Sequence, residues 1–403
     1  MTEASQLSKS RLFLALLALF LSSMCTLGDL VINPIAAQLY VVFADSPEWL
    51  INLGITGPAL AGLPFGLIAG VLCDRVDKQW VMVIGFAIFT VSACLGALIT
   101  NIYYFVVMRL CATGVGWGIT NTAAMSILAD LFTDEDEHGK YVGFYNSVMS
   151  IMGAIMAAVA GFLAVSAWQN AFMTYYIAIP ILIMLIIFLP SFKPEHKNAE
   201  AQATAAETVP KGWWKRSVIL AVQVFFVAIS YFVMLYMIAL YVTDAGVGNE
   251  AFIGVLASAA TIATAVGSFI FGPVYKRMKT AVYLPALFVI ALCFILMGFF
   301  PSTGVTIVCV VLAGFMWPFY FCYFYVRVTE IAPASKAGTA TSIVAFSDGL
   351  AATGSSYLLT GLIGVTGTTA VAVWPTFGVI LIVVGIISAI YVATHFKKQA
   401  AAK

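Results

Sequence analysis

Long apolar runs alternate with short polar segments from one end of the chain to the other. Each run has about 20 residues or more, the length that an α-helix needs to cross the hydrocarbon core of a bilayer. The runs cover approximately residues 12–42, 50–72, 79–100, 103–129, 141–165, 170–190, 216–243, 251–275, 281–300, 304–327, 338–363 and 369–395. We therefore predict twelve membrane-spanning elements, the first being a retained span rather than a cleaved signal peptide.

These spanning elements are expected to be helices. In lipid every backbone N–H and C=O group must find a partner, which only helices and closed barrels achieve. A barrel would show alternating strands of about ten residues, and the chain has no such pattern. The composition agrees, because 62% of the residues are hydrophobic and only 9% are charged. The predicted fold class is an all-α membrane protein.

Basic residues divide the connecting segments into two kinds. Of the 19 Lys and Arg residues, 18 lie in or beside alternate segments. The remaining segments carry only acids, which are Asp45, Glu48, Asp244 and Glu250. Because loops rich in Lys and Arg stay in the cytoplasm, we expect both termini to be cytoplasmic and the protein to lie in the cell (plasma or inner) membrane.

A polar, Ala-rich segment separates the runs into two sets of six. We predict an N-terminal half over residues 1–190, a cytoplasmic linker over 191–215 and a C-terminal half over 216–403. The acids Asp130 and Glu330, each followed by a short loop, mark a weak internal repeat. Two pseudo-symmetric six-helix halves around a midplane site are typical of secondary transporters.

The segment between the second and third runs holds the sharpest motif, Gly70-Val-Leu-Cys-Asp-Arg-Val-Asp-Lys-Gln79. It resembles the loop signature of the major facilitator superfamily, G-x-L-x-D-R-x-G-R/K-R/K. The matching residues are Gly70, Leu72, Asp74, Arg75 and Lys78. Asp77 stands where the signature has Gly, and Gln79 stands where it has a basic residue. The resemblance implies a twelve-span transporter; the alternative is a plain basic loop.

The motif residues have intelligible roles in a cytoplasmic gate. We expect Gly70 to permit a close approach of two helices. Asp74 is expected to face the N-terminus of a neighbouring helix. The cations Arg75 and Lys78 would hold the cytoplasmic side closed.

Arg109 lies inside the fourth apolar run. A bare guanidinium in lipid costs several kcal/mol, so it should face a polar interior and have a partner. Its surroundings resemble the superfamily's R-x-x-Q-G motif, with Ala112 in place of Gln and Thr113 in place of Gly. We expect Arg109 to orient a proton site or a solute; the alternative is a buried Arg that holds helices together.

Asp29 lies deep in the first run, in Gly-Asp29-Leu-Val-Ile-Asn33-Pro34. Pro34 should break or kink the helix, and Asn33 should satisfy the freed backbone groups. The stretch is similar to the first span of the superfamily's drug:proton antiporters. Burial favours a neutral carboxyl and a nearby Arg favours the carboxylate, so the two effects compete. We expect Asp29 to bind a proton; the alternative is a permanent ion pair with Arg109.

Asp348 lies near the middle of the eleventh run, too far from either end to reach water. We expect a second proton site or a contact for a cationic solute. The alternative is a hydrogen-bonded acid at an interface of small residues. Because no His lies within a span, a proton relay falls to carboxylates.

Aromatic side chains gather around Pro318 at the end of the tenth run. Such side chains can line a cavity and bind an aromatic or cationic solute. We single out Trp317 and Tyr320; the alternative is bulky packing with an interfacial belt. The Gly-Pro marker of drug:proton antiporters in the fifth span is Ala157-Ala158 here, so the direction of transport stays open.

The predicted function is secondary transport of a small organic solute by alternating access, in a monomer. Two acids against one Arg favour proton-coupled export of a lipophilic or cationic solute. One alternative is uptake or exchange of a small carboxylate with Arg109 as its anchor. Another is a membrane sensor that transports nothing. We expect no enzyme, since no nucleophile–base spacing or phosphate loop stands out. A net charge of +1 and scattered cysteines predict no nucleic acid, metal or cofactor.

Overall fold

The computed structural model describes residues 9–73, 75–132, 135–192, 212–331 and 337–401 of the chain. Throughout these residues every regular element is helical, and none is a strand. Each of the twelve predicted runs corresponds to one helical segment, so the prediction of an all-α membrane fold is confirmed.

Two compact units divide the chain. The first holds residues 1–205 together with 250–258, and the second holds 206–249 together with 259–403. Of the predicted linker 191–215, only residues 191–192 and 212–215 lie within the described part. The division into halves at this linker, and their pseudo-symmetry, stay predictions.

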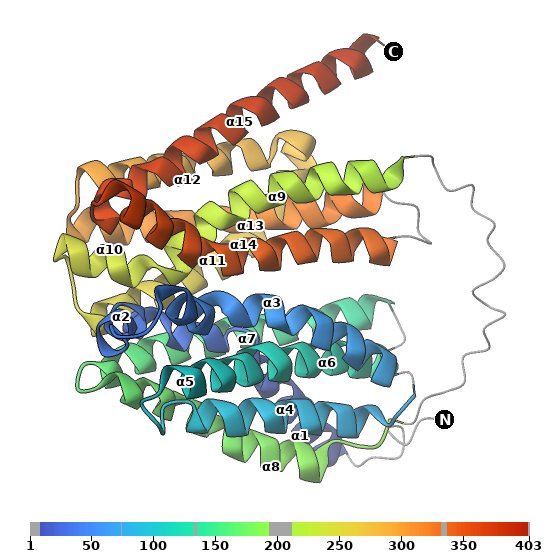
Figure 1. The fold of residues 1–403 in the computed structure, drawn as a ribbon. Coiled ribbons are helices and arrows are strands. Elements are labelled where there is room, and N and C mark those ends of the chain that lie inside the picture. Colours follow the sequence, from blue (N-terminus) through green and yellow to red (C-terminus); the bar gives the residue numbers. More distant parts are fainter. Residues whose placement is uncertain (1–8, 74, 133–134, 193–211, 332–336, 402–403) are drawn as a thin grey trace. The chain divides into compact units, whose positions relative to one another are not determined.

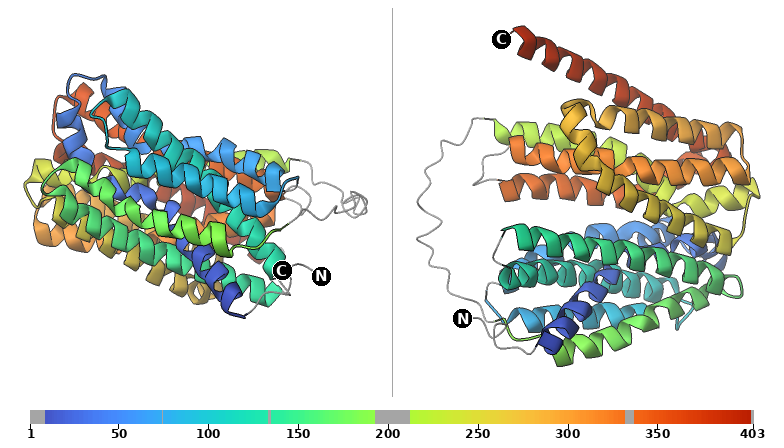
Figure 2. Two further views of the ribbon diagram at one scale, coloured as in Figure 1. Left: turned by 90° about the horizontal axis from the view of Figure 1, so that it is seen from below. Right: turned by 180° about the vertical axis from the view of Figure 1, so that it is seen from behind.

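Helices of the first unit follow one another as Figure 1 shows. Their bounds are α1 (Lys9–Leu21), η2 (Ser22–Cys25), η3 (Gly28–Val31), η4 (Asn33–Ile35), α2 (Ala36–Val42), α3 (Glu48–Cys73), α4 (Lys78–Leu95), α5 (Ile102–Arg109), η5 (Leu110–Gly116), α6 (Trp117–Leu131), α7 (Glu135–Ala164), η6 (Trp168–Ile177) and α8 (Ala178–Phe188). Helix α1 packs across α8 and α7, as Figure 2 shows from behind.

The second unit contains the remaining helices. They are α9 (Trp213–Tyr236), α10 (Ile238–Ala245), α11 (Glu250–Met278), η8 (Lys279–Ala281), α12 (Tyr283–Phe299), α13 (Thr303–Ile331), α14 (Ala337–Thr366) and α15 (Ala370–Ala401). The first nine residues of α11 group with the first unit. Within the second unit α9 packs on α14, and α12 packs on both α15 and α13.

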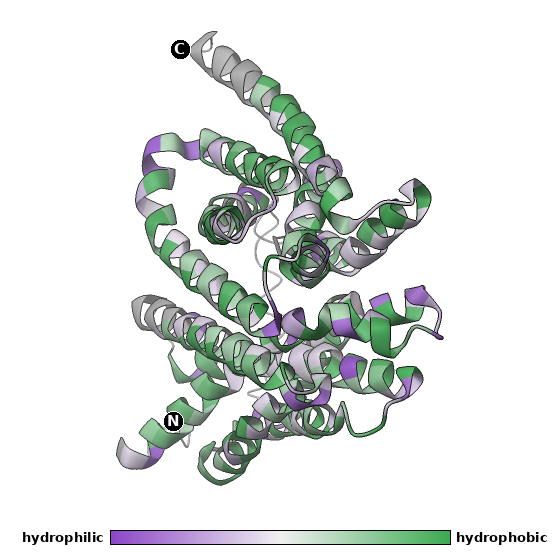
Figure 3. Ribbon diagram, turned by 90° about the vertical axis from the view of Figure 1, so that its left-hand side faces the viewer, coloured by the Kyte–Doolittle hydropathy of each residue, from purple (hydrophilic) through white to green (hydrophobic). Residues whose placement is uncertain are grey.

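Nine helices in the described residues are long and apolar enough to cross a membrane. A bent pair, Ser10–Cys25 with Gly28–Val42, makes a tenth span if it is counted as one. The other two of the twelve segments are α12 and α14. Large apolar side chains such as Phe13, Ile219 and Phe269 are more than 60% exposed, and Figure 3 shows that apolar residues predominate along the helices. An apolar exterior is what contact with lipid requires.

The first span is not one continuous helix. Its two parts meet at an angle of 52° around Thr26 and Leu27. The hydroxyls of Ser22 and Ser23 donate to carbonyl oxygens three residues earlier, at 2.6 and 2.5 Å, and so compete with helical hydrogen bonding. The predicted break is therefore present, but the bend lies well before Pro34.

The fourth span contains a π-helical segment, η5, directly after Arg109. Small residues let its backbone approach both neighbours. A Cβ added to Gly116 would lie 2.7 Å from the backbone nitrogen of Phe89 on α4, and one added to Gly114 would lie 3.0 Å from Cβ of Ala61 on α3. π-Helical turns inside α-helices are frequent at functional sites.

Candidate functional site

The centre of the first unit holds a buried ion pair. Arg109 Nη2 lies 2.6 Å from Asp29 Oδ1, and the two side chains are only 1% and 14% exposed. Asp29 belongs to the 3-10 turn η3, whereas Arg109 is the last residue of α5. The partner that the sequence demanded for Arg109 is therefore Asp29, 80 residues away. Their roles in proton or solute binding stay predictions.

Arg109 also binds the backbone of α3. Its Nε donates to the carbonyl oxygen of Gly54 at 3.1 Å. A single guanidinium thus connects the first, second and fourth spans through one charge-assisted and one backbone contact. Charge-assisted hydrogen bonds are roughly twice as strong as neutral ones, so the contact with Asp29 is the stronger of the two.

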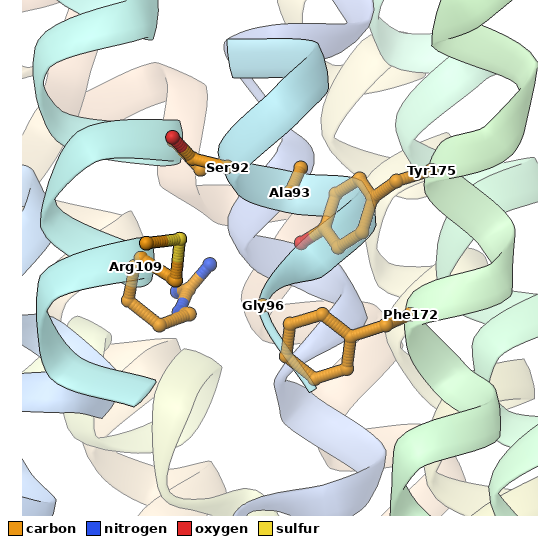
Figure 4. A pocket seen from close by; sticks show the side chains of 8 residues that line it. Ser92, Ala93, Gly96, Arg109, Phe172 and Tyr175 are labelled. Atoms are coloured by element: carbon orange, nitrogen blue, oxygen red, sulfur yellow. The ribbon is translucent and has the colours of Figure 1, made fainter. Parts of the chain in front are cut away.

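Tyr175 supports the same centre from η6. Its hydroxyl donates to the carbonyl oxygen of Gly28 at 2.7 Å, and the residue is 1% exposed. Figure 4 shows Tyr175, Phe172 and Arg109 around one small pocket whose wall also includes Ser92 of α4 and Gly96, the residue after α4. Our reading of the sequence missed Tyr175, because in Tyr175-Tyr176 it resembles an interfacial aromatic and nothing local sets it apart.

Asn33 does not do what the sequence predicted for it. It is fully buried, yet neither Nδ2 nor Oδ1 has a hydrogen-bond partner among the described residues. The backbone around it is satisfied by 3-10 bonds instead, with Ile32 N donating to Asp29 O and Ile35 N donating to Ile32 O, both at 3.0 Å. The expectation that Asn33 satisfies groups freed by Pro34 is wrong, because neither of its side-chain polar atoms forms a hydrogen bond with a described residue.

In the second unit, Asp348 on α14 is an unpaired acid. Its Oδ1 is buried and has no hydrogen-bond partner in the part of the chain that the structure describes. The salt bridges found in that part are Lys78–Asp130 and Arg109–Asp29, and neither involves Asp348. An unpaired buried oxygen costs free energy unless it binds something. Asp348 as a whole is half-buried, and its role as a proton or cation site stays a prediction.

The two aromatic candidates pack within the second unit. Trp317 stacks on Tyr231 with ring centroids 3.8 Å apart and planes 6° apart. The hydroxyl of Tyr320 lies 3.3 Å from the carbonyl oxygens of Gln223 and Val224 on α9. Both candidates are less than 10% exposed, and Tyr320 also interacts electrostatically with Asp348. Packing within the second unit explains much of why Trp317 and Tyr320 stand out in the sequence. Their role in solute binding stays a prediction.

The gate motif lies between α3 and α4. Lys78 Nζ lies 2.5 Å from Asp130 Oδ2 at the end of α6, and Arg75 is exposed. Asp74 lies outside the described residues, so its predicted helix contact is not tested. The expectation that Gly70 permits a close approach of two helices is wrong, because a Cβ there would meet only Thr122 Cγ2, at an ordinary 3.9 Å. The closer contacts of α3 lie one and two turns earlier, at Gly66 and Gly62.

Asp77 replaces the signature's Gly without strain. Its φ of −56° is open to any residue, and its side chain accepts a hydrogen bond from Gln79 N as the N-cap of α4. The same carboxylate accepts hydrogen bonds from Ser191 Oγ and, at 2.8 Å, from Phe192 N. Lys78 N donates back to Phe192 O at 3.1 Å. Asp77 thereby ties the start of α4 to the segment that follows α8.

Together, the helical spans, the broken first span and the buried ion pair define a polytopic helical membrane protein. The sequence profile of the Major Facilitator Superfamily matches residues 12–356. The chain belongs to that family, which points to a transporter rather than an enzyme.

Named relatives match over shorter stretches. One is the uncharacterized transporter mfc1 of Schizosaccharomyces pombe, 29% identical over 151 residues that make up 37% of this chain and 29% of the relative. Another is the methylenomycin A resistance protein of Bacillus subtilis, 28% identical over 151 residues, 36% of this chain and 31% of the relative. The chain thus spans about a third of the length of these relatives.

Solved structures share the fold at low identity. A bacterial homologue of the human lysosomal transporter Spinster, in an inward-facing and occupied conformation, superimposes with a TM-score of 0.73. The match is 17% identical and covers 97% of this chain and 98% of that one. At this identity the likeness concerns the fold alone.

Proposed function

We propose that this protein is a proton-coupled secondary transporter that exports a small lipophilic or cationic solute by alternating access. Asp29 binds the coupling proton, and Arg109 competes with that proton for the carboxylate. The observation that carries the proposal is the Asp29–Arg109 ion pair at 2.6 Å, enclosed where the first span is broken.

The geometry of the pair suits a site that changes its protonation. Arg109 is almost fully buried, whereas Asp29 keeps 14% of its side chain exposed. The carboxylate is therefore the partner that a proton can reach. When a proton neutralises Asp29, Arg109 keeps its bond to Gly54 O but loses its counter-charge, and the unit acquires an uncompensated cation. Such a change in buried charge is large enough to bias a conformational equilibrium.

Asp348 gives the second unit an acid of its own. With its buried Oδ1 unpartnered, it offers a place for a second proton or for the charge of a cationic solute. Two acids against one Arg leave the described spans with a net acidic interior, which favours cations over anions. The resistance function in the name of the Bacillus relative supports export, without bearing on the charge of the solute.

The proposal also includes the setting in which transport occurs. Segments rich in Lys and Arg alternate with acidic ones, which supports cytoplasmic termini and an inner or plasma membrane location. We propose that one chain is the working unit, since each unit already contains its own buried ionisable residue.

Transport by purified protein in proteoliposomes tests the proposal, with ethidium as a lipophilic cation. An imposed proton gradient should drive ethidium accumulation by the unaltered protein. Asp29→Asn should abolish this accumulation but retain ethidium exchange at zero gradient, because the solute still binds. The matched control is Asp45→Asn, at an exposed acid in a connecting segment. Unchanged gradient-driven accumulation in Asp29→Asn would refute proton coupling at this residue.

A second function is uptake or exchange of a small carboxylate. It is favoured by one observation: Arg109 is the single charged residue lining the pocket beside Tyr175. In the same vesicles, radiolabelled benzoate replaces ethidium. Accumulation of benzoate without accumulation of ethidium would select this function, and Arg109→Gln should then abolish it.

A further inference from the structure

Four buried hydroxyl groups in the first unit form no hydrogen bond of ordinary geometry with a described residue; one is that of Thr174 on η6, and the other three form a group. Thr120 on α6 and Tyr145 on α7 are 0% exposed, and the hydroxyl of Thr26, at the bend of the first span, is fully enclosed. None of the three oxygens forms a hydrogen bond of ordinary geometry with a described residue. Each buried hydroxyl left in this condition costs about 1–3 kcal/mol. Three together call for a common explanation.

The three hydroxyls form one cluster. Tyr145 lies within interaction range of Thr26 and of the Cys25 thiol, and that thiol lies within range of Thr26 and Thr120. The packing agrees, because η2 contacts both α6 and α7. Buried polar groups that converge without satisfying one another are the usual setting of an internal water molecule.

The cluster lies one turn from Asp29. Thr26 precedes Asp29 by three residues, across the bend of the first span. Of the three hydroxyls, that of Thr26 is therefore the nearest to Asp29 along the chain.

From Asp29 the cluster extends toward the end of the unit where α1, α4 and α7 begin. Tyr145 is ten residues into α7, about 15 Å from its start at 1.5 Å per residue. Tyr141, one turn closer to that end on the same face of α7, is partly exposed. The hydroxyls therefore lie between the buried acid and a partly exposed position.

We propose that Thr26, Thr120 and Tyr145 bind internal water and form with it a proton pathway between Asp29 and that end of the first unit. The inference rests on the proposed proton coupling at Asp29. Each hydroxyl accepts a hydrogen bond from one neighbour and donates to the next. A proton that enters at Tyr145 is therefore matched by one delivered to Asp29, and every hydroxyl ends with the proton count it had.

The test compares two rates in ethidium-loaded proteoliposomes: proton flux reported by entrapped pyranine, and ethidium exchange without a gradient. Tyr145→Phe and Thr120→Val remove a hydroxyl each. Both should slow proton flux by about tenfold and leave exchange within about twofold. Thr120→Ser keeps the hydroxyl and should restore the flux. The control is Thr90→Val, at a buried threonine whose hydroxyl already binds Phe86 O at 2.7 Å.

The possible results distinguish a failure of this proton pathway from a failure of the proton coupling at Asp29 on which it rests. Normal flux in both Tyr145→Phe and Thr120→Val would overturn the pathway while Asp29→Asn still abolishes coupling. An equal loss of flux and exchange would also overturn it, because that marks a packing role. Gradient-driven flux that survives Asp29→Asn would instead remove the proposed function itself. If Tyr145→Phe does not fold, the comparison of Thr120→Val with Thr120→Ser decides alone.

Discussion

Removing one partner of the Asp29–Arg109 pair should destabilise the protein far more than removing both. At an effective dielectric constant of about 20, unit charges about 4 Å apart attract by about 4 kcal/mol. Arg109 is 1% exposed, so water cannot replace the lost carboxylate. Asp29→Asn and Arg109→Gln alone should each lower the free energy of unfolding by about 3–5 kcal/mol. The double variant contains no buried charge at this site and should recover about 3 kcal/mol of the summed loss.

The assay is reversible unfolding of the purified protein in mixed micelles, applied to all four corners of the double-mutant cycle. The pair Lys78–Asp130 is a matched control, because its side chains are 12% and 28% exposed. Its cycle, with Lys78→Gln and Asp130→Asn, should show a coupling of about 1 kcal/mol or less, since water screens it. Losses at Asp29 and Arg109 that add within about 0.5 kcal/mol would refute the reasoning, since additivity marks independent sites.

Two further predictions concern helix packing and the gate motif. Gly118→Ala should cost about 1–3 kcal/mol in the same assay, because its Cβ would lie 2.3 Å from the carbonyl oxygen of Gly62. Gly70→Ala should stay within about 0.5 kcal/mol, and equal losses at both glycines would contradict this account. Asp77→Gly restores the family residue but removes an N-cap and the bond from Ser191, so it should lower stability by about 1 kcal/mol. Asp77→Asn is the control, because Asn can also cap the helix. If the two variants unfold at the same temperature, loss of the N-cap does not explain the destabilisation.

Much of the architecture follows from local sequence. Twelve apolar runs predicted twelve helical segments, because in lipid each helix must satisfy its own backbone. The break in the first span was also predictable from Pro34, although its position was not. The hydroxyls of Ser22 and Ser23 compete for backbone carbonyls, and this competition depends on side-chain rotamers that a pattern of residue types does not specify.

The site itself was predictable only in part. Burial of a charge in lipid demands a partner, so Arg109 was conspicuous in the sequence and Asp29 was its natural candidate. Tyr175 gave no such signal, since tyrosine is common in membrane spans and its bond to Gly28 O joins residues 147 positions apart. Nothing in the sequence marked the unpaired hydroxyls of Thr120 and Tyr145 either, because threonine and tyrosine are common residues whose role depends on their surroundings.

The sequence by itself determined the class of protein, the number of helical segments and which charges stand alone in apolar surroundings. These properties depend on hydration and backbone hydrogen bonding, which act residue by residue. Only the tertiary structure decided which groups meet: Arg109 with Asp29 and Gly54, and Asp77 with Phe192. Such contacts depend on how small residues let separate helices approach. That is a property of the packed unit and not of any single segment.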